Sequence, residues 1–71
     1  MNKTTNYTVM LISDYNSTAH MDRIEADDNQ WKMTLAAAME NRDQCRADGI
    51  AAAVVVSRVK VGDQYRFSVV R

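Results

Sequence analysis

Two strongly β-forming segments near the C-terminal end constrain the fold more than any other part of the chain. Residues 54–61 and 65–70 are rich in valine and aromatic side chains, and Gly62-Asp63 lies between them. β-Branched and aromatic residues on both sides of a short segment with glycine are typical of a β-hairpin. We therefore expect an antiparallel sheet that contains this hairpin.

The register of the hairpin decides which side chains share a face of the sheet. A loop of two residues would place Val61 opposite Gln64, an apolar side chain opposite a polar one. A loop of three residues, 62–64, would place Val61 opposite Tyr65 and keep one face apolar along the hairpin. Because strand pairing follows the hydrophobic pattern, we predict the three-residue loop.

A helix is expected before the hairpin. Residues 29–47 contain consecutive alanines together with leucine, methionine, lysine and glutamate, all of which form helices readily. Asp27 or Asp28 can accept hydrogen bonds from the first turn, and Gly49 is suited to the left-handed position that often ends a helix. The predicted apolar stripe of this helix consists of Trp31, Leu35, Ala38, Met39 and Cys45.

The N-terminal part allows two interpretations. Residues 7–15 are predicted as a strand that ends at the turn-forming pair Asn16-Ser17. Residues 18–26 fit a second strand or a short helix, with Met21 and Ile24 at helical spacing, and we favour the strand. The predicted fold class is α+β, in the order β-β-α-β-β: one helix on one face of a small antiparallel sheet, in a single domain over residues 1–71.

One helix covers only one face of such a sheet, so the other face would be open. Exposed apolar patches with a charged rim tend to mark interfaces, and burying each large apolar side chain is worth roughly 1.5 kcal/mol or more. We therefore predict that the open face binds a partner. Its apolar residues would be Met10, Ile12, Val54, Val56 and Val70, and its basic residues Arg58, Lys60 and Arg66.

The chain offers little material for catalysis or for a cofactor. Cys45 and His20 are the one cysteine and the one histidine, and Cys45 falls on the predicted buried stripe, where a thiol behaves as a small hydrophobe. The acidic residues between 22 and 28 lack the spacing of a zinc site or a calcium loop. We expect no enzymatic activity, no cofactor and no metal.

Nucleic acid is an alternative partner, because Tyr65-Arg66-Phe67 alternates aromatic and basic side chains on a strand. However, alternation places the two rings on the face opposite Arg66. The net charge of zero and the isoelectric point near 6.5 also disfavour a strong phosphate footprint. A protein target is favoured, and a homodimer through the open face is a further alternative.

The N-terminal segment has only a short apolar run, residues 9–12, whereas a signal peptide needs roughly 7–15 apolar residues and a membrane span about 20. A single cysteine cannot form an internal disulfide, which is typical of proteins in reducing compartments. We expect a cytoplasmic protein that does not associate with membranes.

In its size, its lack of motifs and its strand–helix–strand organisation, the chain resembles small accessory proteins of phages and mobile elements, including anti-CRISPR and other anti-defence inhibitors. This resemblance concerns general organisation. It implies a stoichiometric inhibitor that covers a functional surface on a host or bacterial protein with basic and apolar side chains together.

Overall fold

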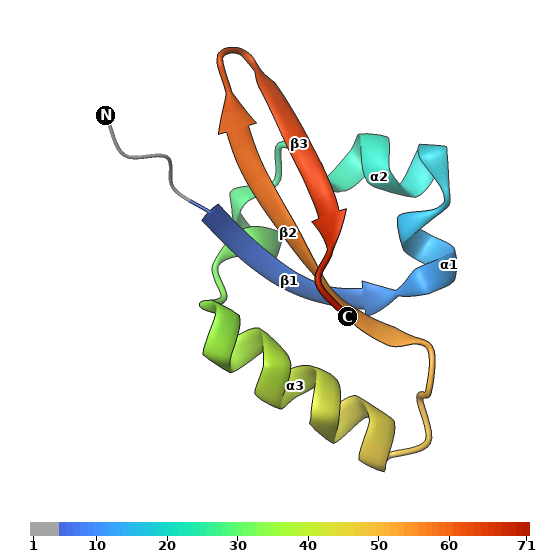
Figure 1. The fold of residues 1–71 in the computed structure, drawn as a ribbon. Coiled ribbons are helices and arrows are strands. Elements are labelled where there is room, and N and C mark those ends of the chain that lie inside the picture. Colours follow the sequence, from blue (N-terminus) through green and yellow to red (C-terminus); the bar gives the residue numbers. More distant parts are fainter. Residues whose placement is uncertain (1–4) are drawn as a thin grey trace.

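The computed structural model describes residues 5–71 as an α+β fold in which one strand precedes all the helices and two strands follow them (Figure 1). The elements are β1 (Thr5–Leu11), α1 (Ile12–Tyr15), α2 (Thr18–Ile24), the 3₁₀ turn η1 (Asp28–Trp31), α3 (Leu35–Ala47), β2 (Ala53–Val61) and β3 (Gln64–Val69). The α+β class is confirmed, but the predicted order β-β-α-β-β is wrong.

The sheet is antiparallel and has the strand order β1-β2-β3. β2 is the central strand, so β1 and β3 each have an outer edge (Figure 1). In the register of the sheet, Thr8 pairs with Val56 and Val56 pairs with Val69. The first and the last strand thus lie on the two sides of β2.

Both faces of the sheet are covered, contrary to the prediction of one open face. Val55 and Val56 are adjacent on β2 and point to opposite faces, yet both have 0% exposure. Val56 lies in a core cluster with Met10 and Trp31, against which side chains of α1 and α2 pack. The other face is covered by α3, which contacts β1 and β2 and buries Ala38.

The segment after β1 is helical. The first strand ends at Leu11, earlier than predicted, and the favoured strand over residues 18–26 is wrong, because residues 18–24 form α2. The Ser17 hydroxyl accepts a hydrogen bond from the backbone N–H of His20 and caps this helix. Met21 and Ile24 then pack on the core from one side of α2.

The long helix begins later than predicted. Residues 28–31 form only the 3₁₀ turn, capped by Asp27, and α3 starts after Thr34, whose hydroxyl accepts from Ala37 N at 3.2 Å. The break between them lets Trp31 turn into the core, with 1% exposure, and donate from Nε1 to the Ile24 carbonyl at 2.9 Å. Gly49 has a φ of +99°, as predicted for the end of the helix.

The hairpin has the shorter of the two loops considered. Val61 pairs with Gln64, so the loop is Gly62-Asp63 and the predicted three-residue loop is wrong. Gly62 has a φ of +62°, whereas Asp63 is not among the residues with positive φ. A positive φ at the first central position alone is the pattern of a type II′ turn, which favours glycine there. This register moves every residue of β3 to the face opposite the one predicted.

Candidate functional site

The residues predicted to bind a partner divide between the interior and the surface. Met10, Val56 and Arg58 are buried, and Val54 packs against the core cluster, so the expectation that they point outward is wrong. Ile12 and Val70, each 37% exposed, lie on the surface with Lys60 and Arg66. A role in partner binding stays a prediction for these four.

Arg58 uses its guanidinium group inside the molecule. Nη1 donates to the Glu25 carbonyl at 2.7 Å, and Nη2 donates to Asp28 Oδ1 at 2.8 Å. The guanidinium carbon lies 4.4 Å from the ring centroid of Tyr65 and 5.3 Å from that of Trp31. With 4% exposure, Arg58 joins the segment before η1 to the sheet and is not available to a ligand.

The predicted basic cluster does not form. Arg66 pairs with Val59 and Lys60 pairs with Tyr65, so Lys60 and Arg66 lie on opposite faces of the hairpin. The prediction that these two residues share the open face is therefore wrong. The ring of Phe67 packs toward Trp31, with centroids 5.4 Å apart, on the face opposite Arg66 as predicted.

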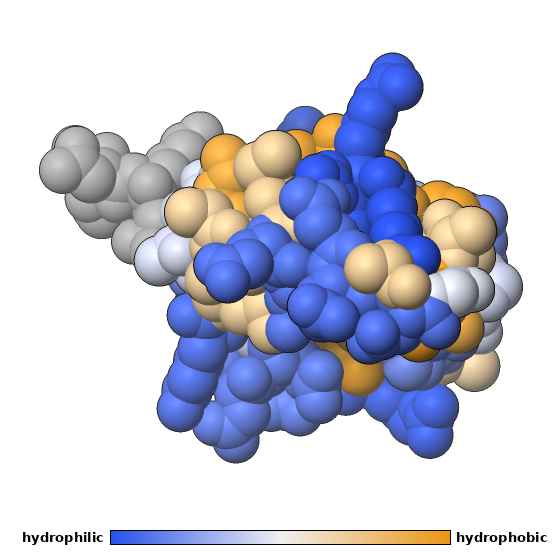
Figure 2. Space-filling model, turned by 90° about the horizontal axis from the view of Figure 1, so that it is seen from below, coloured by the Kyte–Doolittle hydropathy of each residue, from blue (hydrophilic) through white to orange (hydrophobic). Residues whose placement is uncertain are grey.

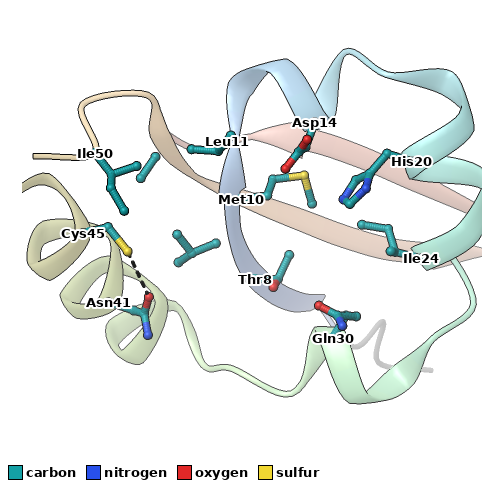
Figure 3. A pocket seen from close by; sticks show the side chains of 12 residues that line it. Thr8, Met10, Leu11, Asp14, His20, Ile24, Gln30, Asn41, Cys45 and Ile50 are labelled. Carbon is teal, nitrogen blue, oxygen red and sulfur yellow. Dashed lines mark hydrogen bonds between the residues drawn. The ribbon is translucent and has the colours of Figure 1, made fainter. Parts of the chain in front are cut away.

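A cavity of about 290 Å³ follows the outer edge of β1 (Figure 3). Helices flank it on both sides: α1 and α2 on the side of Met10, and α3 with the segment after it on the side of Leu11. Its lining comprises Thr8, Val9, Met10, Leu11, Asp14, His20, Ile24, Gln30, Asn41, Cys45, Ile50 and Ala53. We call this cavity the β1 groove.

The hydrogen bonds of β2 show which way the peptide groups of β1 point. Val70 N donates to the Val55 carbonyl at 2.7 Å, so the peptide groups of Val55 face β3. Because peptide groups alternate in direction along a strand, those of Val56 face β1, where Val56 pairs with Thr8. The even-numbered residues of β1 therefore bond to β2.

It follows that Val9 directs its N–H and C=O groups, and Leu11 its N–H, away from β2 into the β1 groove. The Leu11 carbonyl, at the N-cap of α1, accepts the first hydrogen bond of that helix. Ile12, the next even-numbered residue, follows the same alternation, since its N–H donates to the Ala52 carbonyl at 2.9 Å. Leu11 is also 38% exposed. The floor of the groove is thus a strand edge with outward-facing donors and acceptors.

Two residues before Val9, on the same edge of β1, another segment of the chain already pairs with this strand. Tyr7 forms an isolated antiparallel bridge with Met33, just before Thr34 begins α3. Within residues 5–71, no strand continues this pairing to Val9 and Leu11. The groove therefore starts where the intramolecular partner of the edge ends.

The groove does not assemble a nucleophile with a base. Cys45 is half-buried and its thiol donates to Asn41 Oδ1 at 3.6 Å. His20 lies on the other side of β1, as Figure 3 shows. In the described part of the chain, no group of three histidine, cysteine or carboxylate side chains is placed to hold a metal ion.

Sequence reasoning missed the β1 groove because it depends on two helices. α2 was predicted as a strand, and a strand there would have paired with β1 and occupied the same edge. The signal that could have corrected this is Ser17, a helix-capping residue, followed by Met21 and Ile24 at helical spacing.

Comparison with family models, curated proteins and solved structures gave no match for this chain. None of the helices between residues 5 and 71 has the length and apolar character needed to cross a membrane.

Proposed function

We propose that this protein is a non-catalytic binding protein that captures an extended segment of another protein as an additional strand on β1. The observation that carries this proposal is the outward direction of the Val9 N–H and C=O groups and of the Leu11 N–H at the floor of a groove between two helical layers. Strand addition uses main-chain hydrogen bonds for affinity and side pockets for specificity, and the β1 groove offers both.

The shape of the groove favours one extended segment over a second copy of this chain. Paired strands lie about 4.8 Å apart, so the partner strand must enter between the helices that flank β1. A second β1 carries its own flanking helices, which would collide with these before the two strands could pair. A loop or terminal segment of another protein has no such obstacle.

The same geometry fits the inhibitory role that the sequence suggests. A protein that sequesters a functional segment of its target acts stoichiometrically and needs no catalytic group. Arg58, which was expected to bind the partner, is committed to the fold, which leaves main-chain recognition at β1 as the supported mode of binding.

A proline at residue 9 tests the proposal. Val9→Pro removes an N–H that points into the groove and leaves the hydrogen bonds between β1 and β2 in place, since Pro is tolerated at an outer strand edge. We expect the variant to keep its circular-dichroism spectrum and to lose at least about tenfold in affinity for peptides selected on the wild type, equal to 1.4 kcal/mol or more. The matched control is Val9→Thr, which keeps the N–H and should bind as the wild type does.

A second readout covers the case in which Val9→Pro does not fold. Cys45 lines the groove, so a bound peptide should slow the alkylation of its thiol by iodoacetamide in the wild-type protein. Equal binding by folded Val9→Pro, or selected peptides that leave the alkylation rate of Cys45 unchanged, would overturn the proposal.

A further inference from the structure

We infer that the segment captured on β1 runs antiparallel to it and carries a cationic side chain between two apolar ones. This inference rests on the proposed function and assigns the chemistry of the partner. It follows from the bridge between Tyr7 and Met33 and from the different linings on the two sides of β1.

The direction follows from the segment already in place. Met33 pairs with Tyr7 in the antiparallel sense, so the sheet edge is shaped for a strand of that direction. In an antiparallel pair, a residue opposite an outward-facing position exchanges both of its main-chain hydrogen bonds with it. Val9 offers both of its groups and Leu11 its N–H, because the Leu11 carbonyl already accepts the first hydrogen bond of α1, so the incoming segment can form three main-chain hydrogen bonds.

The two residues opposite Val9 and Leu11 place their side chains on the α3 side of the sheet, because paired residues share a face. That side of the groove is lined by the apolar side chains of Leu11, Ile50 and Ala53, with the Cys45 thiol and the Asn41 amide beside them. Leu11 and Ile50 are 38% and 44% exposed without a ligand. Apolar residues of the partner at both positions would bury these side chains.

The residue between them lies opposite Met10 and points to the α2 side. There the groove is lined by Met10 and Ile24 and by the polar side chains of Thr8, Asp14, His20 and Gln30 (Figure 3). Asp14 is the one carboxylate of the lining, and the lining contains no lysine or arginine. A lysine or arginine of the partner can lay its aliphatic part on Met10 and Ile24 and place its charge at Asp14.

Fluorescent peptides with the core Thr-Ile-Lys-Val-Thr, Thr-Ile-Glu-Val-Thr and Thr-Ser-Lys-Ser-Thr test this inference by fluorescence anisotropy. We expect the Ile-Lys-Val peptide to bind most tightly, and both replacements to weaken binding by about tenfold. Asp14→Asn should remove the preference for lysine over glutamate, and Asp14→Lys should reverse it. Asp63→Asn, in the hairpin loop away from the groove, is the matched control and should leave the preference unchanged.

The possible results distinguish a wrong assignment of the partner's side chains from a failure of strand capture itself. Equal binding of all three peptides, lost in Val9→Pro, would overturn the apolar–cationic–apolar assignment and leave strand capture standing. A lysine preference that survives Asp14→Lys would also overturn the assignment. No binding of any of the three peptides, while peptides selected on the wild type do bind, overturns the assignment alone. If selection on the wild-type protein yields no binding peptide at all, the proposed function itself is overturned.

Discussion

Arg58 is a buried cation in the interior of a very small domain. Its guanidinium group lies between the rings of Tyr65 and Trp31 and donates to the Glu25 carbonyl and to Asp28. Two hydrogen bonds and two aromatic faces offset part of the cost of removing the charge from water, while the buried Nε has no hydrogen-bond partner within residues 5–71. Asp28 is mostly exposed, so the carbonyl and the rings contribute more than the ion pair does.

Loss of Arg58 should therefore destabilise the fold strongly. We expect Arg58→Ala to lower the free energy of unfolding by about 3 kcal/mol, because it leaves a cavity and an unpaired carbonyl. The matched control is Arg66→Ala, at an exposed position of the hairpin, which should change the free energy of unfolding by less than about 0.5 kcal/mol. Urea denaturation followed by tryptophan fluorescence measures both. Equal effects of the two substitutions would contradict the buried role of Arg58.

From the sequence alone, an arginine that follows alternate valines on a strand is expected to mark the solvent-facing side. That expectation failed at Arg58 because its partners come from residues 25–31, and their path could not be predicted without knowing that α2 is a helix. The core role of Phe67 could be predicted, since an aromatic side chain on a strand needs only an apolar surface to pack against.

At the scale of elements, local signals were reliable where a single residue sets the backbone. The left-handed Gly49 ends α3, and the glycine at the first position of the hairpin loop favours the two-residue turn. The hydrophobic pattern led to the prediction of a different register, because that prediction was made for a sheet with only one buried face. Since both faces of β2 are buried near its start, pattern alone cannot select between the registers.

The contribution of one residue to the stability of a helix is easiest to measure at Thr34. Its hydroxyl accepts a hydrogen bond from Ala37 N in the first turn of α3. We expect Thr34→Ala to lower the free energy of unfolding by about 1 kcal/mol and Thr34→Ser to preserve it, as for other N-terminal caps. Thermal unfolding by circular dichroism compares the two. Equal losses in the two variants would show that packing of the Thr34 methyl group, which both variants lack, matters and capping does not.

The part of the chain that the structure describes measures 38 × 26 × 18 Å, with a radius of gyration of 12.0 Å. Viewed from the side of α3, its surface is mostly hydrophilic, with smaller apolar areas between (Figure 2). Between residues 5 and 71, the buried apolar residues are few: Met10, Trp31, Ala38, Ala53, Val55 and Val56. A chain of this size gains little stability from its core, so binding of a partner that buries more apolar surface should stabilise it further.

The β1 groove is a property of the whole fold, because it exists only where α2 and α3 meet the edge of β1 from opposite sides. The sequence predicts the α+β class, most of the strands and one long helix, each of which depends on local residues. It does not predict the groove, since that depends on the position of three elements relative to one another.

Amide hydrogen exchange of β1 tests strand capture most directly. In the free protein, the amide protons of Thr8 and Met10 should exchange slowly and those of Val9 and Leu11 quickly, because only the former pair face β2. Saturation with the Ile-Lys-Val peptide should slow the exchange of Val9 and Leu11 and leave Thr8 and Met10 unchanged. Val9 and Leu11 amides that already exchange slowly without peptide, or that stay fast at saturation, would contradict the account.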